Sequence, residues 1–356
     1  MESELERSAT GEWPVDLVLE GGGVKGIALA GALAVLEERG YDPRSLAGAS
    51  AGAIAATLYA AGYSAEELHH ELARIPFQEF LDKGFEDRIP LIGKGVSVLF
   101  DHGVYEGTAF LDWMRGMLAR KNVRTFGDLP RGQNGEHRLQ VIASDLTARR
   151  LLVLPGDASL FGLEPDDLEL AWAVRMSMSI PVFFEPVPWS NASTGEEHVI
   201  VDGGMLSNFP VWLFDAEGEP RWPTFGLMLS EPNPREHAGA RIPATEGSEG
   251  PVKGLISYLT SVIGTMLEAN DRRYLEQADY ARTIPIPTLG VGTTEFDLSP
   301  ERAEELYQSG RQAAVHFLDE VWDFEGYKAQ FRRGTTLSRR RQVADAMRSA
   351  SAEGSG

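Results

Sequence analysis

The chain has 356 residues, no cysteine and a formal net charge of −20. This length is sufficient for a large core in one or two domains, and the lack of cysteine excludes disulfides, thiolate nucleophiles and cysteine metal ligands. The excess of acidic residues argues against nucleic-acid binding, because a protein needs clustered lysine and arginine to neutralise the phosphates. It also argues against purely electrostatic docking on an anionic membrane.

The two ends of the chain carry weak structural signals. Residues 1–12 are predicted to be a disordered leader, because residues 1–14 hold five charges and lack the apolar run of a signal peptide. Residues 331–356 are predicted to be a flexible tail, and we interpret their arginines as solvated rather than lipid-binding. Between them we expect one domain over residues 13–330. The longest apolar stretch, near 255–267, is too short to cross a bilayer, so we expect a cytoplasmic protein that is at most peripheral to a membrane.

The first 70 residues alternate between strand and helix patterns. Residues 15–19 predict a buried strand, 26–38 a helix, 45–48 a short strand and 51–61 a helix of small residues. This alternation is typical of a parallel α/β sheet. Farther along we expect helices at 107–119, 166–178, 252–277 and 300–322, and strands at 139–144, 151–154, 198–201 and 224–229.

Two segments lack the hydrophobic periodicity of a helix or a strand. Residues 76–104 mix aromatic, glycine and apolar residues, which suits a lid or an acyl-contact surface, or else an ordinary loop packed on the core. Residues 231–251 are rich in proline, glycine, glutamate and alanine and predict a mobile insertion.

A glycine-rich run follows the first predicted strand: Gly21, Gly22, Gly23, Val24, Lys25 and Gly26. Consecutive glycines expose backbone N–H groups, which suits an oxyanion hole as well as a phosphate cradle. The run fits neither common nucleotide-binding pattern, since no serine or threonine follows the lysine and the nearby Asp42 is expected in a turn. Lys25 either adds positive charge there or is solvated.

A second glycine-framed motif surrounds Ser50. Gly48, Ala49, Ser50, Ala51 and Gly52 form a G-x-S-x-G pattern between a short strand and a small-residue helix, the setting of a nucleophile elbow. The elbow turn is strained and passes close to neighbouring chain, which explains its glycines. The pattern alone also fits a strand-to-helix turn without chemistry.

A serine nucleophile needs a base. Seven histidines are present and none has a compelling setting, although His102, in a glycine-flanked turn, is the best of them. Asp202 is better placed, because it ends a predicted strand and is followed by Gly203 and Gly204. By itself an Asp-Gly-Gly sequence also fits a tight turn.

Together these motifs closely resemble those of the patatin-like phospholipase family. The chain is similar in type to the bacterial patatin-like serine acyl hydrolases. Residues 21–26 resemble its oxyanion motif, 48–52 its nucleophile elbow and 202–204 its D-G-[GA] motif. Segments 143–147, 177–186 and 208–210 also resemble the family's pattern, and the match covers roughly residues 15–230. The predicted C-terminal helices, at about 252–322, carry no motif of the family.

The resemblance implies a three-layer α/β/α fold with a central, mainly parallel sheet. It also implies hydrolysis of carboxylic esters of lipids or phospholipids by a Ser50–Asp202 dyad through an acyl-enzyme, without metal or cofactor. The expected partner is a lipid or acyl-ester substrate, met transiently at a membrane or micelle surface.

Two other functions stay open. One is an esterase or thioesterase acting on soluble acyl substrates. The other is a non-enzymatic module that binds a nucleotide or an acyl group through the glycine-rich run.

Overall fold

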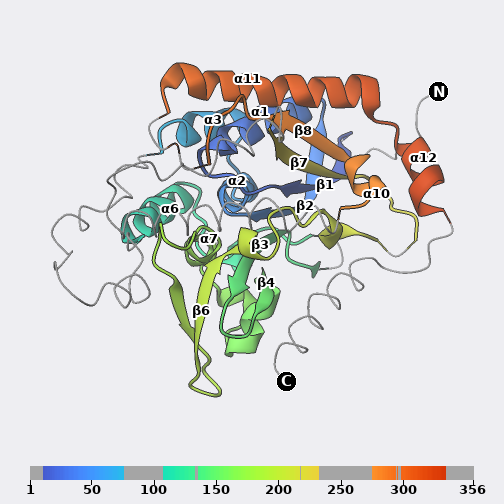
Figure 1. Cartoon of the computed structure of the whole chain (residues 1–356). Helices are drawn as coiled ribbons and strands as arrows, with labels where there is room; N and C mark the ends of the chain where they lie inside the picture. The colour runs from blue at the N-terminus through green and yellow to red at the C-terminus, as the bar shows by residue number, and fades with distance from the viewer. Residues whose placement is uncertain are drawn as a thin grey trace, which may run out of the picture.

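A computed structural model describes residues 11–75, 107–132, 135–216, 218–231, 275–293, 295 and 298–333. Eight of the described strands form one sheet in the order β5-β6-β3-β2-β1-β7-β8, with β4 also paired to β3 (Figure 1). Their bounds are Trp13–Leu19 (β1), Tyr41–Ala49 (β2), Leu139–Asp145 (β3), Arg150–Leu154 (β4), Val187–Ser190 (β5), Glu197–Asp202 (β6), Thr224–Ser230 (β7) and Thr283–Pro287 (β8).

Four of the seven strand pairings described in this sheet are parallel. β1 pairs in parallel with β2 and β7, β2 with β3, and β7 with β8. The strands β4 and β6 run antiparallel to β3, and β5 runs antiparallel to β6. Buried apolar side chains fill the central strands, as expected for a parallel sheet covered on its faces.

The pairing of β3 places two other strand ends against each other. β2 pairs with β3 as far as Ala49 opposite Ile142, whereas β6 pairs with β3 from Ala143, opposite Asp202. β4 overlaps both stretches of β3 and must therefore occupy the opposite edge. β2 and β6 consequently share one edge of β3, and their carboxyl ends meet there head to head.

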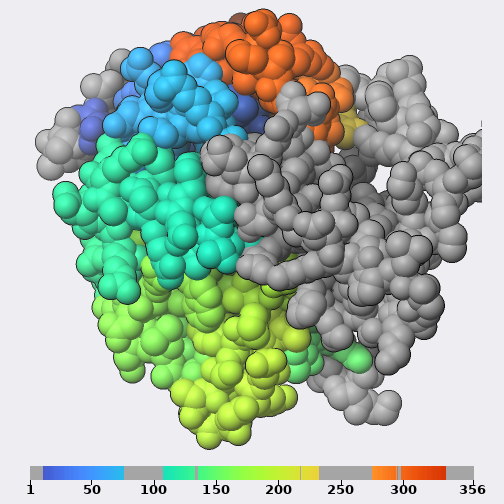
Figure 2. Space-filling view, turned by 90° about the vertical axis from the view of Figure 1, so that its left-hand side faces the viewer, coloured from blue at the N-terminus to red at the C-terminus, as the bar shows by residue number. Residues whose placement is uncertain are grey.

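Helices cover the sheet. α1 packs mainly on α11, and α3 packs on α1, so segments far apart in the sequence lie side by side (Figure 1). The bounds of the helices are Ile27–Glu38 (α1), Ala51–Ala60 (α2), Ala65–Leu72 (α3), Thr108–Arg120 (α6), Leu170–Ser177 (α7), Gln277–Tyr280 (α10), Pro300–His316 (α11) and Phe324–Tyr327 (α12). On the surface, α3 adjoins α11 (Figure 2), where the rings of His69 and Tyr307 stack with centroids 3.7 Å apart.

A second apolar cluster covers the other face of the central strands. There Phe209 and Trp212 pack against Val18, Ala47 and Ile142. The fold is therefore a mainly parallel sheet flanked by helices, the expected three-layer α/β/α class.

Most predicted elements are confirmed, with some corrections. β2 begins at Tyr41, so Asp42 lies in a strand and not in a turn. α7 begins at Leu170, because Glu169 forms a β-bridge with Thr125. α11 ends at His316, and a wider π-helical turn follows it.

Two strands were not predicted. β5 alternates exposed and buried residues over only four positions. β8 carries two prolines, which a sheet tolerates at an edge, where a strand has only one neighbour to bond.

Several predictions lie outside the described residues. They are the leader over residues 1–10, the segment 76–104 with His102, the insertion over 232–251 with His237, most of the helix at 252–277, and the tail from 334. The single domain over residues 13–330 stays a prediction.

The contact between α1 and α11 depends on two glycines. A β-carbon at Gly310 would lie 1.9 Å from the carbonyl oxygen of Ala28, and one at Gly31 would lie 2.0 Å from that of Tyr307. Neither backbone oxygen can move without separating the helices. We expect Gly310→Ala to lower the free energy of unfolding by about 2 kcal/mol, as measured by urea denaturation.

The matched control is Gly116→Ala on α6, where a β-carbon would meet no atom within 4 Å. We expect this variant to gain about 0.5 kcal/mol, because alanine favours the helix. Equal effects of the two substitutions would contradict the close-packing argument.

Candidate active site

Ser50 lies at a sharp turn between β2 and α2. Its backbone has φ 50° and ψ −123°, a conformation that residues other than glycine rarely adopt and that stores strain. The Ser50 carbonyl accepts hydrogen bonds from the N–H groups of Ala53 and Ile54, at 2.9 and 3.2 Å. The residue is only 6% exposed. The turn thus has the strained geometry predicted for a nucleophile elbow.

The flanking glycines allow close backbone contacts. A β-carbon at Gly52 would lie 2.2 Å from the carbonyl oxygen of Leu19, and one at Gly48 would lie 2.3 Å from that of Gly52. The first turn of α2 therefore packs directly on the end of β1. Ala51 is the first residue of α2, so its N–H has no partner within the helix.

The glycine-rich run lies beside Ser50. A β-carbon on Gly21 would lie 3.0 Å from Cβ of Ser50. Residues Gly23–Gly26 form a 3₁₀ turn that leads into α1. The N–H groups of Gly22 and Gly23 donate no hydrogen bond within the described residues, so they are available to a bound oxygen atom.

Other groups of this run are already engaged. The N–H of Val24 donates to the carbonyl oxygen of Thr293 at 3.3 Å, and that of Gly21 donates to the carbonyl oxygen of Asn208 at 3.2 Å. Gly26 lets α1 approach α2, since a β-carbon there would lie 3.2 Å from Cβ of Ala51. Lys25 is 7% exposed, so the alternative of a solvated side chain is wrong.

Asp202 ends β6 and is fully buried. Its Oδ1 accepts a hydrogen bond from the N–H of Gly204 at 2.7 Å. Gly203 allows the turn to pass close to β3, because a β-carbon there would lie 2.3 Å from the carbonyl oxygen of Ile142. Oδ2 is buried and makes no hydrogen bond in the described structure.

Burial raises the pKa of Asp202 to about 7, against the opposing effects of the Gly204 N–H and the Ser50 hydroxyl. Desolvation disfavours a charged carboxylate in this way. A carboxyl group that is buried, incompletely hydrogen-bonded and shifted toward neutral pH is a feature of functional sites more than of structural ones.

Ser50 and Asp202 are brought together although 152 positions separate them in the sequence. The head-to-head strand ends place Asp202 opposite Ala143 and Ala49 opposite Ile142. The Ser50 hydroxyl is close enough to lower the pKa of the Asp202 carboxyl. The predicted pair therefore occupies one site, together with Gly21, Gly22 and Gly23.

Three of the five described histidines have partners away from Ser50. His198 is buried on β6 with Nδ1 2.9 Å from Oδ2 of Asp145. His137 contacts Asp166 through Nε2 at 2.7 Å. His69 lies beside Glu304, and no hydrogen bond joins Ser50 to any histidine of the described ranges.

Two residues near the site were not predicted to act there. Asn208 Nδ2 donates to the carbonyl oxygen of Gly21 at 3.0 Å, which clamps the glycine-rich run. Ser177 Oγ accepts a hydrogen bond from the N–H of Ser50 at 2.9 Å. Both lie in segments that resemble the family's pattern, but nothing in the sequence indicates these contacts.

A small apolar cavity of about 10 Å³ adjoins the glycine-rich run. Its lining includes Gly23, Val24 and Ala51 on one side, together with the apolar side chains of Ile54, Leu72 and Ile75. None of the described residues that line it has a polar side chain, so this space offers no hydrogen-bond partners to a water molecule from side chains.

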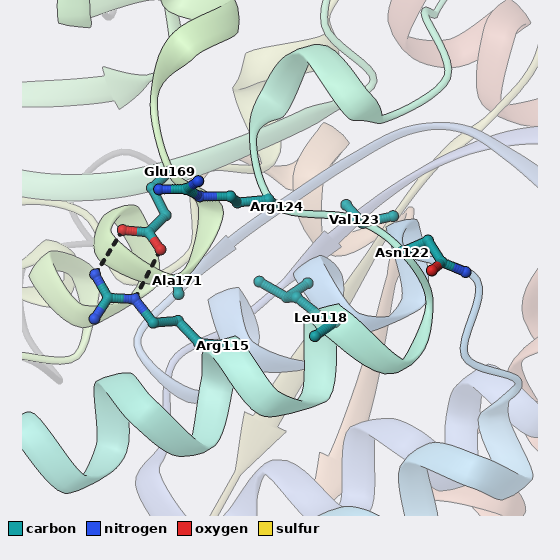
Figure 3. Close-up of a pocket in the computed structure, with 8 residues that line it drawn as sticks. Arg115, Leu118, Asn122, Val123, Arg124, Glu169 and Ala171 are labelled. Carbon is teal, nitrogen blue, oxygen red and sulfur yellow. Dashed lines mark hydrogen bonds and ion pairs between the residues drawn. The ribbon is translucent and has the colours of Figure 1, made fainter.

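A larger depression of about 570 Å³ lies between α6 and α7 (Figure 3). Arg115 and Glu169 meet there in a two-pronged ion pair, at 2.7 and 2.8 Å. None of the predicted site residues lines this depression. Among the described residues that line it, the single carboxylate, Glu169, is already paired with Arg115.

The fold and the site match a known family. The family model for patatin-like phospholipases covers residues 17–215, more than half of the chain. The uncharacterized protein YqhO of Bacillus subtilis (strain 168) is 37% identical over 310 residues, which are 87% of this chain and 99% of that protein. The chain belongs to the patatin-like phospholipase family, and this membership supports a hydrolase that acts on lipids.

Other similarities are more distant. Lysophospholipase NTE1 of Mycosarcoma maydis is 26% identical over 88% of this chain and 15% of its own length. The crystal structure of VipD from Legionella pneumophila has a TM-score of 0.49 at 19% identity, over 89% of this chain and 70% of that one. None of the described helices is both long and apolar enough to cross a membrane.

Burial of Asp202 has a consequence for stability. Because its folded pKa of about 7 exceeds the ordinary value of 3.8, the folded protein retains a proton that the unfolded chain releases between these two values. This group therefore lowers stability as pH rises from about 4 to 7, and its full cost is present above pH 7. We expect Asp202→Asn to be more stable than the parent near pH 8, by at most about 4 kcal/mol, and to lose this advantage near pH 4.

Urea denaturation at several pH values measures this difference. The control is Asp166→Asn, because His137 and Arg131 hold the pKa of the exposed Asp166 below its usual value. That variant is expected to lose stability at neutral pH instead. A stability difference for Asp202→Asn that does not change with pH would contradict the assignment of a desolvated carboxyl.

Proposed function

We propose that this protein hydrolyses carboxylic esters of lipids or phospholipids through a Ser50–Asp202 dyad. Asp202 accepts the proton of the Ser50 hydroxyl while Oγ attacks the ester carbonyl, and the alcohol leaves with a proton. Water then cleaves the acyl-enzyme with Asp202 again as the base. The observation that carries this proposal is the buried Asp202 carboxyl beside the Ser50 hydroxyl, at the head-to-head ends of β2 and β6.

The pKa of Asp202 supports its role as a base. An ordinary aspartate, with a pKa near 3.9, is a weak base at neutral pH. A pKa of about 7 leaves the carboxyl half ionised at neutral pH and makes it a stronger proton acceptor, which is the condition that general-base catalysis favours.

The N–H groups of Gly22, Gly23 and Ala51 are the proposed oxyanion donors. The first two lie in the run that contacts Ser50 and have no hydrogen bond in the described structure. Ala51 follows the nucleophile at the amino end of α2, where the helix dipole favours negative charge. We leave Val24 out of this set, because its N–H already binds Thr293.

Contact between the glycine-rich run and Ser50 also favours an acyl group over a nucleotide. A phosphate cradle has no need of a strained serine beside it. Here a β-carbon at Gly21 would almost touch the Ser50 side chain, so the run and the serine form one site. The small cavity next to Ala51 has an apolar lining, which is compatible with an acyl group and unfavourable for a phosphate.

Loss of the nucleophile tests the proposal. We expect Ser50→Ala to lower ester hydrolysis at least about 1,000-fold, because the acyl-enzyme cannot form. The assay incubates each protein with a mixed lipid extract and identifies the released products by mass spectrometry. A fluorophosphonate should label Ser50 in the parent and leave Ser50→Ala unlabelled.

Ser309→Ala serves as the control, since this serine lies on α11 and donates to the carbonyl oxygen of Pro287. Its activity should equal that of the parent. Unlabelled parent protein that binds nucleotide tightly would favour the non-enzymatic module instead. A lack of rate increase when the substrate exceeds its aggregation limit would favour an esterase or thioesterase of soluble substrates.

Enlarging the small apolar cavity beside Ala51 tests whether the acyl chain passes there. We expect Leu72→Ala to enlarge the apolar cavity and to move the optimum of kcat/KM toward longer p-nitrophenyl esters. Leu68→Ala on the same helix is the control, because Leu68 is also buried but does not line the cavity. Each substitution is expected to cost about 2–5 kcal/mol of stability, so the two differ only in their effect on the cavity. Identical profiles would place the acyl chain elsewhere.

A further inference from the structure

One short turn touches both residues of the proposed dyad. It runs from Ser177, the last residue of α7, to Ser179. The N–H of Ser50 donates to Ser177 Oγ at 2.9 Å, and the N–H of Asp202 donates to the carbonyl oxygen of Ser179 at 2.9 Å. We propose that Ser177 is a positioning residue, and that this turn holds the nucleophile and the carboxyl in register for proton transfer. The inference rests on the proposed function.

The contact to Ser50 acts on its strained backbone. The carbonyl of Ser50 is already fixed by the first turn of α2, through Ala53 and Ile54. Its N–H precedes the helix, so Ser177 Oγ supplies the remaining restraint. Both groups are buried, where an unpaired N–H is costly and the hydrogen bond is strong. The positive φ of Ser50 is thereby held from both sides.

The contact to Asp202 is made by backbone alone. β6 ends where the Asp202 N–H leaves the sheet and bonds to Ser179. A side-chain substitution at position 179 leaves this hydrogen bond in place. A side-chain substitution can therefore test only the other contact, the hydrogen bond from the Ser50 N–H to Ser177 Oγ.

Arg175 anchors the turn from within α7. Its guanidinium donates to the Ser179 hydroxyl and, at 2.9 Å, to the carbonyl oxygen of Glu185. Ser179 Oγ in turn donates to the carbonyl oxygen of Arg175 at 2.7 Å. A β-carbon at Gly107, the residue before α6, would lie 2.1 Å from Nε of Arg175. The guanidinium is thus enclosed on several sides, and it fixes the turn to α7 and to the chain beyond it.

The experiment measures the reactivity of Ser50 directly. We expect Ser177→Ala to lower the second-order rate of fluorophosphonate labelling roughly 10- to 100-fold, because a small misplacement of a nucleophile has an effect of that size. In ester hydrolysis the loss should appear in kcat, with KM changed by less than about twofold. Ser177→Thr keeps the hydroxyl and should recover most of the rate. Ser309→Ala is the control, because Ser309 is a buried serine on α11 whose hydroxyl donates to the carbonyl oxygen of Pro287; this variant should label like the parent.

The pH profile of labelling distinguishes positioning from loosening of the site. If Ser177 acts by positioning, Ser177→Ala lowers the plateau and leaves the midpoint near that of the parent. A hydrated, loosened site would instead move the midpoint down toward the ordinary value of an aspartate, and this result would overturn the proposal. Melting temperatures confirm that every variant is folded at the assay temperature.

The two proposals fail in different ways. If the parent protein is not labelled at Ser50, the dyad itself is wrong. If the parent is labelled and Ser177→Ala is labelled at the same rate, the dyad stands and the positioning role of Ser177 is refuted.

Discussion

The site depends on how one edge of β3 is shared. β2 runs up this edge and ends at Ala49, and β6 runs down it and ends at Asp202. An edge can hold only one partner at each position, so the two strands stop where they meet. Because each is followed immediately by a turn, Ser50 and Asp202 project from the same point of the sheet. Rearrangement at this junction would move both residues.

Desolvation gives this junction its chemistry. The same packing that closes the core around Asp202 raises its pKa to about 7, because water no longer stabilises the charged carboxylate. The energetic cost of burying this carboxyl is offset by the packing of the rest of the fold. In a more solvated aspartate, water would stabilise the charged carboxylate, and the carboxylate would be a weaker base. Burial and proposed function are thus two consequences of one arrangement.

Close backbone approach is the second constraint. Gly52 brings α2 onto the end of β1, Gly21 brings the glycine-rich run against Ser50, and Gly310 brings α11 onto α1. These contacts share one physical cause, since no room remains for a β-carbon between the two backbones. The turn at Ser177–Ser179 completes the frame with hydrogen bonds to Ser50 and Asp202.

The sequence by itself determined the strand–turn–helix order of the first 60 residues and the sharp turn at Ser50, because hydrophobic periodicity and glycine placement are local features. It also predicted Asp202 as a candidate base, which stays a prediction. The strand predicted at 45–48 was too short, since β2 covers Tyr41–Ala49. The strand β8 was not predicted, because it contains prolines, which are tolerated only at a sheet edge. Only the tertiary structure decided which partners meet: Ser177 with Ser50, Asn208 with Gly21 and Thr293 with Val24. It also decided the ionisation of Asp202. Hydrogen bonds across more than a hundred residues, and the burial of a carboxyl, depend on how the chain packs and have no local signature.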